Sequence, residues 1–181
     1  MIEAIKDQDP EVRKAALAAV GKLGPVIGAP GAKEVMPTLL DAVQGKDAKA
    51  RDEALETIAV LGPLAKEAVN PLITLMEKED IKLYYNPQKS PTPFLQEKDD
   101  EFLNKIAKAL GKIGKDAVKP LLRSVKTTNL NAGLLIGTCR ALGEIGPPAK
   151  DALPDLRAIS YQMPPEIGKE ADRAMRKIRA K

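Results

Sequence analysis

The chain has 181 residues, a formal net charge of +4, 44% hydrophobic and 30% charged residues, and only 3% aromatic residues. A core with so few aromatic side chains must be built from Ala, Leu, Ile and Val, which suits closely packed helices and disfavours a β-sandwich. Histidine and tryptophan are absent, which removes the commonest general base, His-activated nucleophiles and mixed Cys–His zinc sites. We therefore expect a chain that is not an enzyme and uses no cofactor or metal.

Targeting signals are also missing from the sequence. It contains no run of 18 apolar residues, so we expect no membrane span. Its first residues, MIEAIKDQDPEV, lack the apolar stretch of a secretory signal. These observations favour a cytoplasmic protein, while the lone Cys139 leaves the compartment open.

Four similar units follow one another along the chain. Each has a helical segment that ends in a glycine-punctuated signature: GKLG at 21–24, AVLG at 59–62, GKIG at 111–114 and GEIG at 143–146. A second apolar stretch follows each signature and carries a proline: Pro37, Pro71, Pro120 and Pro154. Such self-similarity predicts a solenoid, in which each unit buries its apolar face against its neighbours.

The first unit begins with a predicted helix capped by Asp9, with Pro10 in its first turn. Its apolar positions recur at helical spacing: Val12, Ala15, Ala16, Ala19, Val20 and Leu23. Gly24 is expected to end this helix in a left-handed conformation, and Pro25 to prevent its continuation. A second apolar stripe then follows, made of Val35, Met36, Leu39, Leu40 and Val43.

Units two to four repeat this pattern. The second unit is expected to turn inward Ala54, Leu55, Ile58 and Leu61. The third is expected to turn inward Phe102, Leu103, Ile106, Ala109, Leu110 and Ile113. In the fourth, Gly133 and Gly137 each cost the first helix about 1 kcal/mol relative to Ala, and we expect them to allow close helix approach. Cys139 lies in the same apolar stretch and is predicted to be buried.

An insertion at 79–99 separates units two and three. It contains Tyr84, Tyr85 and Phe94, three of the five aromatic residues in the chain, beside several X–Pro pairs that block regular helix. A long loop with concentrated aromatics suits partner recognition. The alternative is that these side chains fold back to cover an edge of the solenoid.

The units resemble HEAT repeats, in particular the short HEAT-like repeats of phycobiliprotein lyases. The residues that carry the resemblance are Asp9 to Arg13, the glycine signatures, and the segments AVNPLI at 68–73, AVKPLL at 117–122 and ALPDL at 152–156. The resemblance implies an all-α solenoid of about four helix hairpins. IEAIKD at 2–7 and GKEADRAMRKIRAK at 168–181 would then be half-repeats at the ends of a single domain, 1–181. We expect this domain to be cut from a longer array, and the alternative is that these are atypical half-repeats that cap it.

Charge is distributed unevenly along the chain. Residues 1–100 hold 13 basic and 17 acidic residues, net −4, whereas 101–181 hold 16 basic and 8 acidic residues, net +8. Lys105, Lys108, Lys112 and Lys115 share one face of a first helix, and Lys119, Arg123 and Lys126 lie on its partner. A solvated face is the favoured interpretation, and nucleic-acid binding through the basic half is the alternative.

The glycine signatures do not indicate a phosphate-binding loop. Such loops present backbone N–H groups at the start of a helix, whereas these glycines are expected to close helices, where free carbonyls repel anions.

Together these patterns predict a scaffold that binds a protein or peptide partner. The resemblance implies that second helices form the concave side, where Thr38, Asp41, Thr74, Lys78, Lys119, Arg123 and Arg157 are expected to be exposed, with Tyr84, Tyr85 and Phe94 at the rim. It also suggests a bilin lyase or lyase subunit as the enzymatic alternative, for which no catalytic residue can be carried over.

Overall fold

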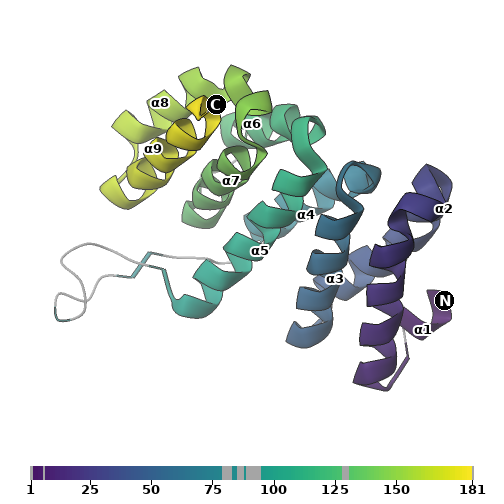
Figure 1. Cartoon of the computed structure of the whole chain (residues 1–181). Coiled ribbons are helices and arrows are strands. Elements are labelled where there is room, and N and C mark those ends of the chain that lie inside the picture. The colour runs from purple at the N-terminus through teal and green to yellow at the C-terminus, as the bar shows by residue number, and fades with distance from the viewer. Residues whose placement is uncertain are drawn as a thin grey trace.

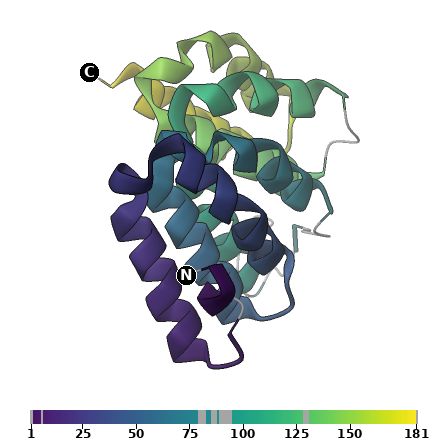
Figure 2. The same ribbon diagram turned by 90° about the vertical axis from the view of Figure 1, so that its right-hand side faces the viewer.

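The chain folds as an α-solenoid of stacked helix hairpins, as predicted (Figure 1). The computed structural model describes residues 2–5, 7–78, 83–84, 88, 95–127 and 131–180. The units stack in chain order, and the view turned by 90° shows the N-terminal unit below and the C-terminal units above (Figure 2). This architecture gives the molecule two long surfaces, one made by the first helices of the units and one by the second helices.

The first helices are the N-terminal part of α2 (Pro10–Gln44), then α3 (Ala48–Leu61), α5 (Glu97–Ile113), α7 (Ala132–Ile145) and α9 (Pro165–Arg179). The second helices are the C-terminal part of α2, then α4 (Val69–Lys78), α6 (Val118–Thr127) and α8 (Leu153–Gln162). Short 3₁₀ segments join the pairs: η1 (Gly62–Ala68), η2 (Gly114–Ala117) and η3 (Pro147–Ala152). The short α1 (Ile2–Ile5) packs on α2. Because α5 begins at Glu97, the last three residues of the predicted 79–99 loop are helical.

Polar side chains define where several helices begin. Asp9 caps α2 by accepting a hydrogen bond of 2.8 Å from the backbone N–H of Glu11, as predicted. Asp47 caps α3 in the same way, and the backbone hydrogen bond from Ala50 lowers the pKa of its carboxyl. Asn131 caps α7. These caps satisfy backbone donors that have no partner inside the helix.

Glycine closes the first helices in three units. Gly62, Gly114 and Gly146 have positive φ, a conformation that only glycine adopts without strain. The first unit differs from prediction, because its helix continues through Gly24 and Pro25 and breaks at Gly28, with φ 56° and ψ −163°. Pro30 lacks a backbone N–H and therefore suits the first turn of the helix that follows the break. This explains why the break lies just before Pro30.

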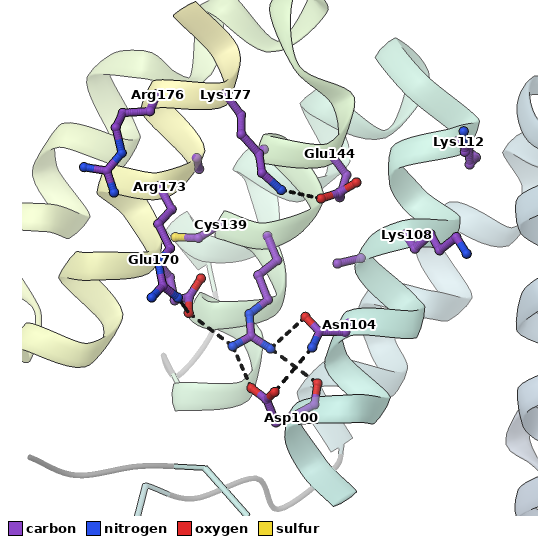
Figure 3. A pocket seen from close by; sticks show the side chains of 14 residues that line it. Asp100, Asn104, Lys108, Lys112, Cys139, Glu144, Glu170, Arg173, Arg176 and Lys177 are labelled. Carbon is purple, nitrogen blue, oxygen red and sulfur yellow. Dashed lines mark hydrogen bonds and ion pairs between the residues drawn. The ribbon is translucent and has the colours of Figure 1, made fainter. Parts of the chain in front are cut away.

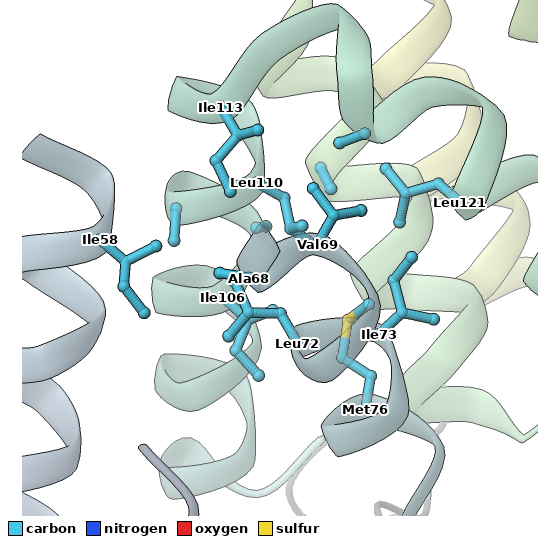
Figure 4. Close-up of a cluster of buried hydrophobic side chains, with 14 of the residues drawn as sticks. Ile58, Ala68, Val69, Leu72, Ile73, Met76, Ile106, Leu110, Ile113 and Leu121 are labelled. Carbon is cyan, nitrogen blue, oxygen red and sulfur yellow. The ribbon is translucent and has the colours of Figure 1, made fainter. Parts of the chain in front are cut away.

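The core runs through all the units and consists of aliphatic side chains. The predicted inward residues of units two and three are buried, and Figure 4 shows side chains of α3, α4, α5 and α6 meeting in the middle of the solenoid. The first unit is less covered: Val12 and Leu23, expected inside, are each 39% exposed, and Ala15 is exposed. These residues lie at the N-terminal end of the stack, where α1 covers only part of α2.

In units three and four, the first glycine of the signature allows neighbouring first helices to approach closely. A side chain at Gly111 of α5 would clash with Glu144 of α7. A Cβ at Gly143 of α7 would lie 3.2 Å from the Cα of Ala174 in α9. In the second unit this position is Ala59 rather than glycine. In units three and four the signature therefore has two roles, close packing at its first glycine and helix termination at its second.

By length and composition alone, one stretch, 48–78, is long and apolar enough to cross a membrane. This was not predicted from the sequence, because the stretch contains charged residues and no unbroken run of 18 apolar residues. The structure divides it into α3, η1 and α4, with a positive φ at Gly62, and half of its apolar window is buried inside the solenoid. These features are those of core helices in a folded domain.

Candidate functional site

A groove of about 790 Å³ crosses three consecutive first helices (Figure 3). We call it the first-helix groove. Its lining residues come from α5 (Asp100, Asn104, Ala107, Lys108 and Lys112), α7 (Cys139, Arg140, Gly143 and Glu144) and α9 (Glu170, Arg173, Ala174, Arg176 and Lys177). Small residues such as Gly143 form part of its lining because the helices pack closely there, while long charged side chains form the walls.

Arg140 lies at the centre of the groove and joins all three helices. Its guanidinium is 2.7 Å from a carboxylate oxygen of Asp100 on α5 and 3.2 Å from one of Glu170 on α9, and it also donates to the side-chain oxygen of Asn104. Burial alone would lower the pKa of Arg140, but the hydrogen bonds to Glu170 and Asp100 outweigh it and raise that pKa. Arg140 is therefore a fixed cation with its charge neutralised by carboxylates.

Equivalent positions in successive units line the groove. Three residues before the first signature glycine stand Lys108 in α5 and Arg140 in α7, and Arg173 takes the same place in α9. One residue after that glycine stand Lys112 and Glu144, with Lys177 in α9. The groove therefore presents two rows of charged side chains that run along the solenoid, across the helices.

The groove carries an excess of positive charge. Six of its lining residues are basic and three are acidic (Asp100, Glu144 and Glu170), a net charge of +3. Glu170 pairs with both Arg140 and Arg173, and Glu144 pairs with Lys177 at 2.5 Å. Within the described part of the chain, Lys108, Lys112 and Arg176 have no ion-pair partner. Cations on both walls are therefore available to an anionic ligand.

A second groove, of about 500 Å³, lies between α3 and α5. Lys105 bridges it, with its Nζ 2.6 Å from Asp52 on α3 and 2.7 Å from Glu101 on α5. Burial alone would lower the pKa of Lys105, but the hydrogen bonds to Asp52 and Glu101 outweigh this effect and raise that pKa. Lys105 is thus half-buried and paired, not solvated as predicted. Lys108 lines both grooves, so α5 forms the ridge between them.

The residues predicted for partner binding lie elsewhere. Lys78 of α4, Lys119 and Arg123 of α6 and Arg157 of α8 are exposed on second helices, and Thr74 of α4 is half-buried.

Two further predicted residues lie on the C-terminal part of α2. Asp41 is exposed as expected, but Thr38, expected to be exposed, is 6% exposed and belongs to the core. Its phase on α2 places it beside Leu39 and Val35, on the side that faces the neighbouring helices. Tyr84 is 39% exposed, and Tyr85 and Phe94 lie outside the described residues.

Most of the groove was not predicted from the sequence. The lysines of α5 were grouped on one face, but Arg140, Arg173, Arg176 and Lys177 were not among the predicted site residues. The signal was present in the repeat register, because aligning the units on their glycine signatures brings Lys108, Arg140 and Arg173 into one column.

Cys139 is buried as predicted, and burial raises the pKa of its thiol to about 12. We therefore expect the folded protein at mildly alkaline pH to react with a thiol reagent such as DTNB orders of magnitude more slowly than the protein unfolded in guanidinium. The reaction is followed by absorbance. Equal rates in the folded and unfolded states would contradict a buried, protonated thiol.

Residues 1–27 match the family model described as HEAT repeat. The match is to the general repeat and does not single out the lyase type. No curated protein is significantly similar to the chain in sequence.

Several solved structures are similar to this chain, among them designed armadillo repeat proteins. One, in complex with the peptide (KR)4, is 15% identical with a TM-score of 0.49, over 98% of this chain and 80% of that chain. Another, designed for modular peptide recognition, is 16% identical with a TM-score of 0.45, over 97% and 79%. A third is 11% identical with a TM-score of 0.41, over 98% of each chain.

Proposed function

We propose that this α-solenoid is a non-catalytic scaffold that binds a segment of a partner protein in the first-helix groove. The observation that carries the proposal is the groove itself, which spans α5, α7 and α9 and has a volume of about 790 Å³. Ligand sites are concave surfaces of this order of size. The three helices that form it are fixed relative to one another by the Arg140 ion pairs, so little ordering of the protein is needed on binding.

The titratable groups of the groove support binding rather than catalysis. A general acid or base works best with a pKa near the working pH. The pKa of Arg140 is raised and that of Cys139 is raised to about 12, so both stay protonated at neutral pH. The sequence contains no histidine that could act as a general acid or base.

The second-helix surface is the competing location for the partner. It carries Thr74, Lys78, Lys119, Arg123 and Arg157, which were predicted from the sequence to bind a partner. We favour the first-helix groove because its walls combine a concave shape with three cations that have no ion-pair partner in the described part of the chain.

Steric blocking of each surface tests the proposal. Random peptides displayed on phage are selected against the whole chain, and binding of the selected peptides is measured by fluorescence anisotropy. Arg176→Cys on α9 and Arg157→Cys on α8 are each labelled with a polyethylene glycol maleimide. Both remove one exposed arginine, and the native Cys139 is too buried to compete for the label.

We expect the label at position 176 to abolish binding of the selected peptides and the label at position 157 to leave it unchanged. Circular dichroism controls for folding of both proteins. Failure to select any peptide, or loss of binding only with the label at position 157, would overturn the proposal.

A further inference from the structure

The cations of the first-helix groove form a row with a defined end. Lys108, Arg140 and Arg173 occupy equivalent positions in α5, α7 and α9. At the same position in α3 stands Glu56, which lines the second groove and carries the opposite charge. The positive surface therefore begins at α5 and extends across three helices.

Within this surface, the positive charge that a ligand could neutralise is divided between the two walls. Asp100 and Glu170 already neutralise Arg140 in the centre. Lys108 and Lys112 on α5 and Arg176 on α9 have no ion-pair partner among the described residues. Figure 3 shows Lys112 and Arg176 on opposite sides of the groove. A complementary ligand therefore carries separated negative charges, one near each wall, rather than a single cluster.

Helix spacing fixes the separation between those charges. Packed helices lie about 8–10 Å apart, and the small residues at the first signature position hold these helices close. Side chains on one face of a β-strand recur about every 6.6 Å. In a polyproline II helix, which has 3 residues per turn and a rise of about 3.1 Å per residue, they recur about every 9.3 Å. The side-chain repeat of a polyproline II peptide therefore equals the spacing of the helices, so every third side chain of the peptide would lie over the next helix.

A nucleic-acid strand fits the groove less well. It carries a phosphate at every nucleotide, and some of these would meet the carboxylates of Asp100, Glu144 and Glu170. Single-strand binders also stack bases on aromatic side chains, and the lining residues of this groove include none.

We propose that the first-helix groove binds an acidic peptide segment in the polyproline II conformation, with two carboxylates six residues apart, one near each wall. This inference rests on the proposed function, because it specifies the ligand of the same groove. The segment crosses α5, α7 and α9, with its two carboxylates near Lys108 and Lys112 on one wall and near Arg176 on the other.

Two fluorescein-labelled peptides of identical composition test the spacing. One is Glu-Pro-Pro-Gln-Pro-Pro-Glu-Pro-Pro, and the other has the two Glu residues together, followed by the Gln and the six Pro residues. Binding to the whole chain is measured by fluorescence anisotropy at low and at physiological salt. We expect the spaced peptide to bind about tenfold more tightly than the clustered one, since only the spaced peptide reaches both walls.

Charge reversal tests the location. Lys108→Glu with Arg176→Glu should weaken binding of the spaced peptide by about tenfold or more. The matched control, Lys119→Glu with Arg157→Glu, reverses one Lys and one Arg on the second-helix surface and should leave the Kd unchanged. Circular dichroism establishes folding, and the single Arg176→Glu variant replaces the double variant if the latter is unstable.

Three results would overturn the inference: equal binding of the two peptides, tighter binding of a single-stranded oligonucleotide, or loss of binding only in the second-helix variant. The display selection separates this inference from the proposed function. If selected peptides bind in the groove but are not acidic, the proposed function stands and the acidic ligand is wrong. If the label at position 176 blocks no selected peptide, the groove as a binding site is wrong.

Discussion

Replacing Leu110 by Asp is expected to unfold the middle of the solenoid. Leu110 is fully buried in α5, within the cluster formed with α4 and α6 (Figure 4). The substitution removes a large apolar side chain and places a carboxylate within a cluster of buried apolar side chains, and the two effects together should lower the free energy of unfolding by more than about 4 kcal/mol. Urea denaturation followed by circular dichroism measures this change.

Lys112→Asp is the matched control. It introduces the same side chain two residues further along α5, at an exposed position without an ion-pair partner in the described part of the chain. We expect a change below about 0.5 kcal/mol, as for most surface substitutions. If Lys112→Asp proved the more damaging of the two, the helical phase described for α5 would be wrong.

The second large effect is expected for Arg140→Met. Removing the guanidinium leaves Asp100 and Glu170 without their shared cation, and the Glu170 side chain is only 12% exposed. Loss of a partly buried ion pair that joins three helices should lower the free energy of unfolding by about 2–3 kcal/mol. The same denaturation experiment measures it.

Two further variants separate this ion-pair effect from a general packing effect. Arg173→Met removes another cation that pairs with Glu170, but its side chain is 63% exposed, so a loss of about 0–1 kcal/mol is expected. Adding Glu170→Gln to Arg140→Met should recover part of the lost stability, because it removes a largely buried carboxylate that is left with only the exposed Arg173 as a partner. Strict additivity of the two substitutions would show that Arg140 does not act through Glu170.

The helical phase and the end of three first helices were predictable from the sequence because both depend on local chemistry. Apolar residues at helical spacing identified the buried side of α5, and a glycine marked the end of α3, α5 and α7. The same rule was wrong in the first unit, where Gly24 was chosen and the break falls at Gly28. Two glycine–proline segments follow each other there, Gly24-Pro25 and Gly28 to Pro30, and the local pattern does not distinguish them.

The groove was less predictable because its contacts join residues far apart in the chain. Arg140 pairs with Asp100 and Glu170, 40 and 30 residues away. No local pattern reports such a pairing, since it depends on how closely three helices approach. For the same reason Lys105 was assigned to a solvated face, whereas it bridges to Asp52 on the neighbouring helix.

The first signature position has a consequence for how this molecule can vary. A Cβ added at Gly111 would meet Glu144 of α7, and one added at Gly143 would meet Ala174 of α9, so a methyl group at either position would change the spacing of that pair of helices. The alanine at position 59 illustrates this adjustment, since the α3–α5 groove opens beside it. Changes of this kind allow the curvature of the array to be distributed unevenly along its length without any change in the core residues.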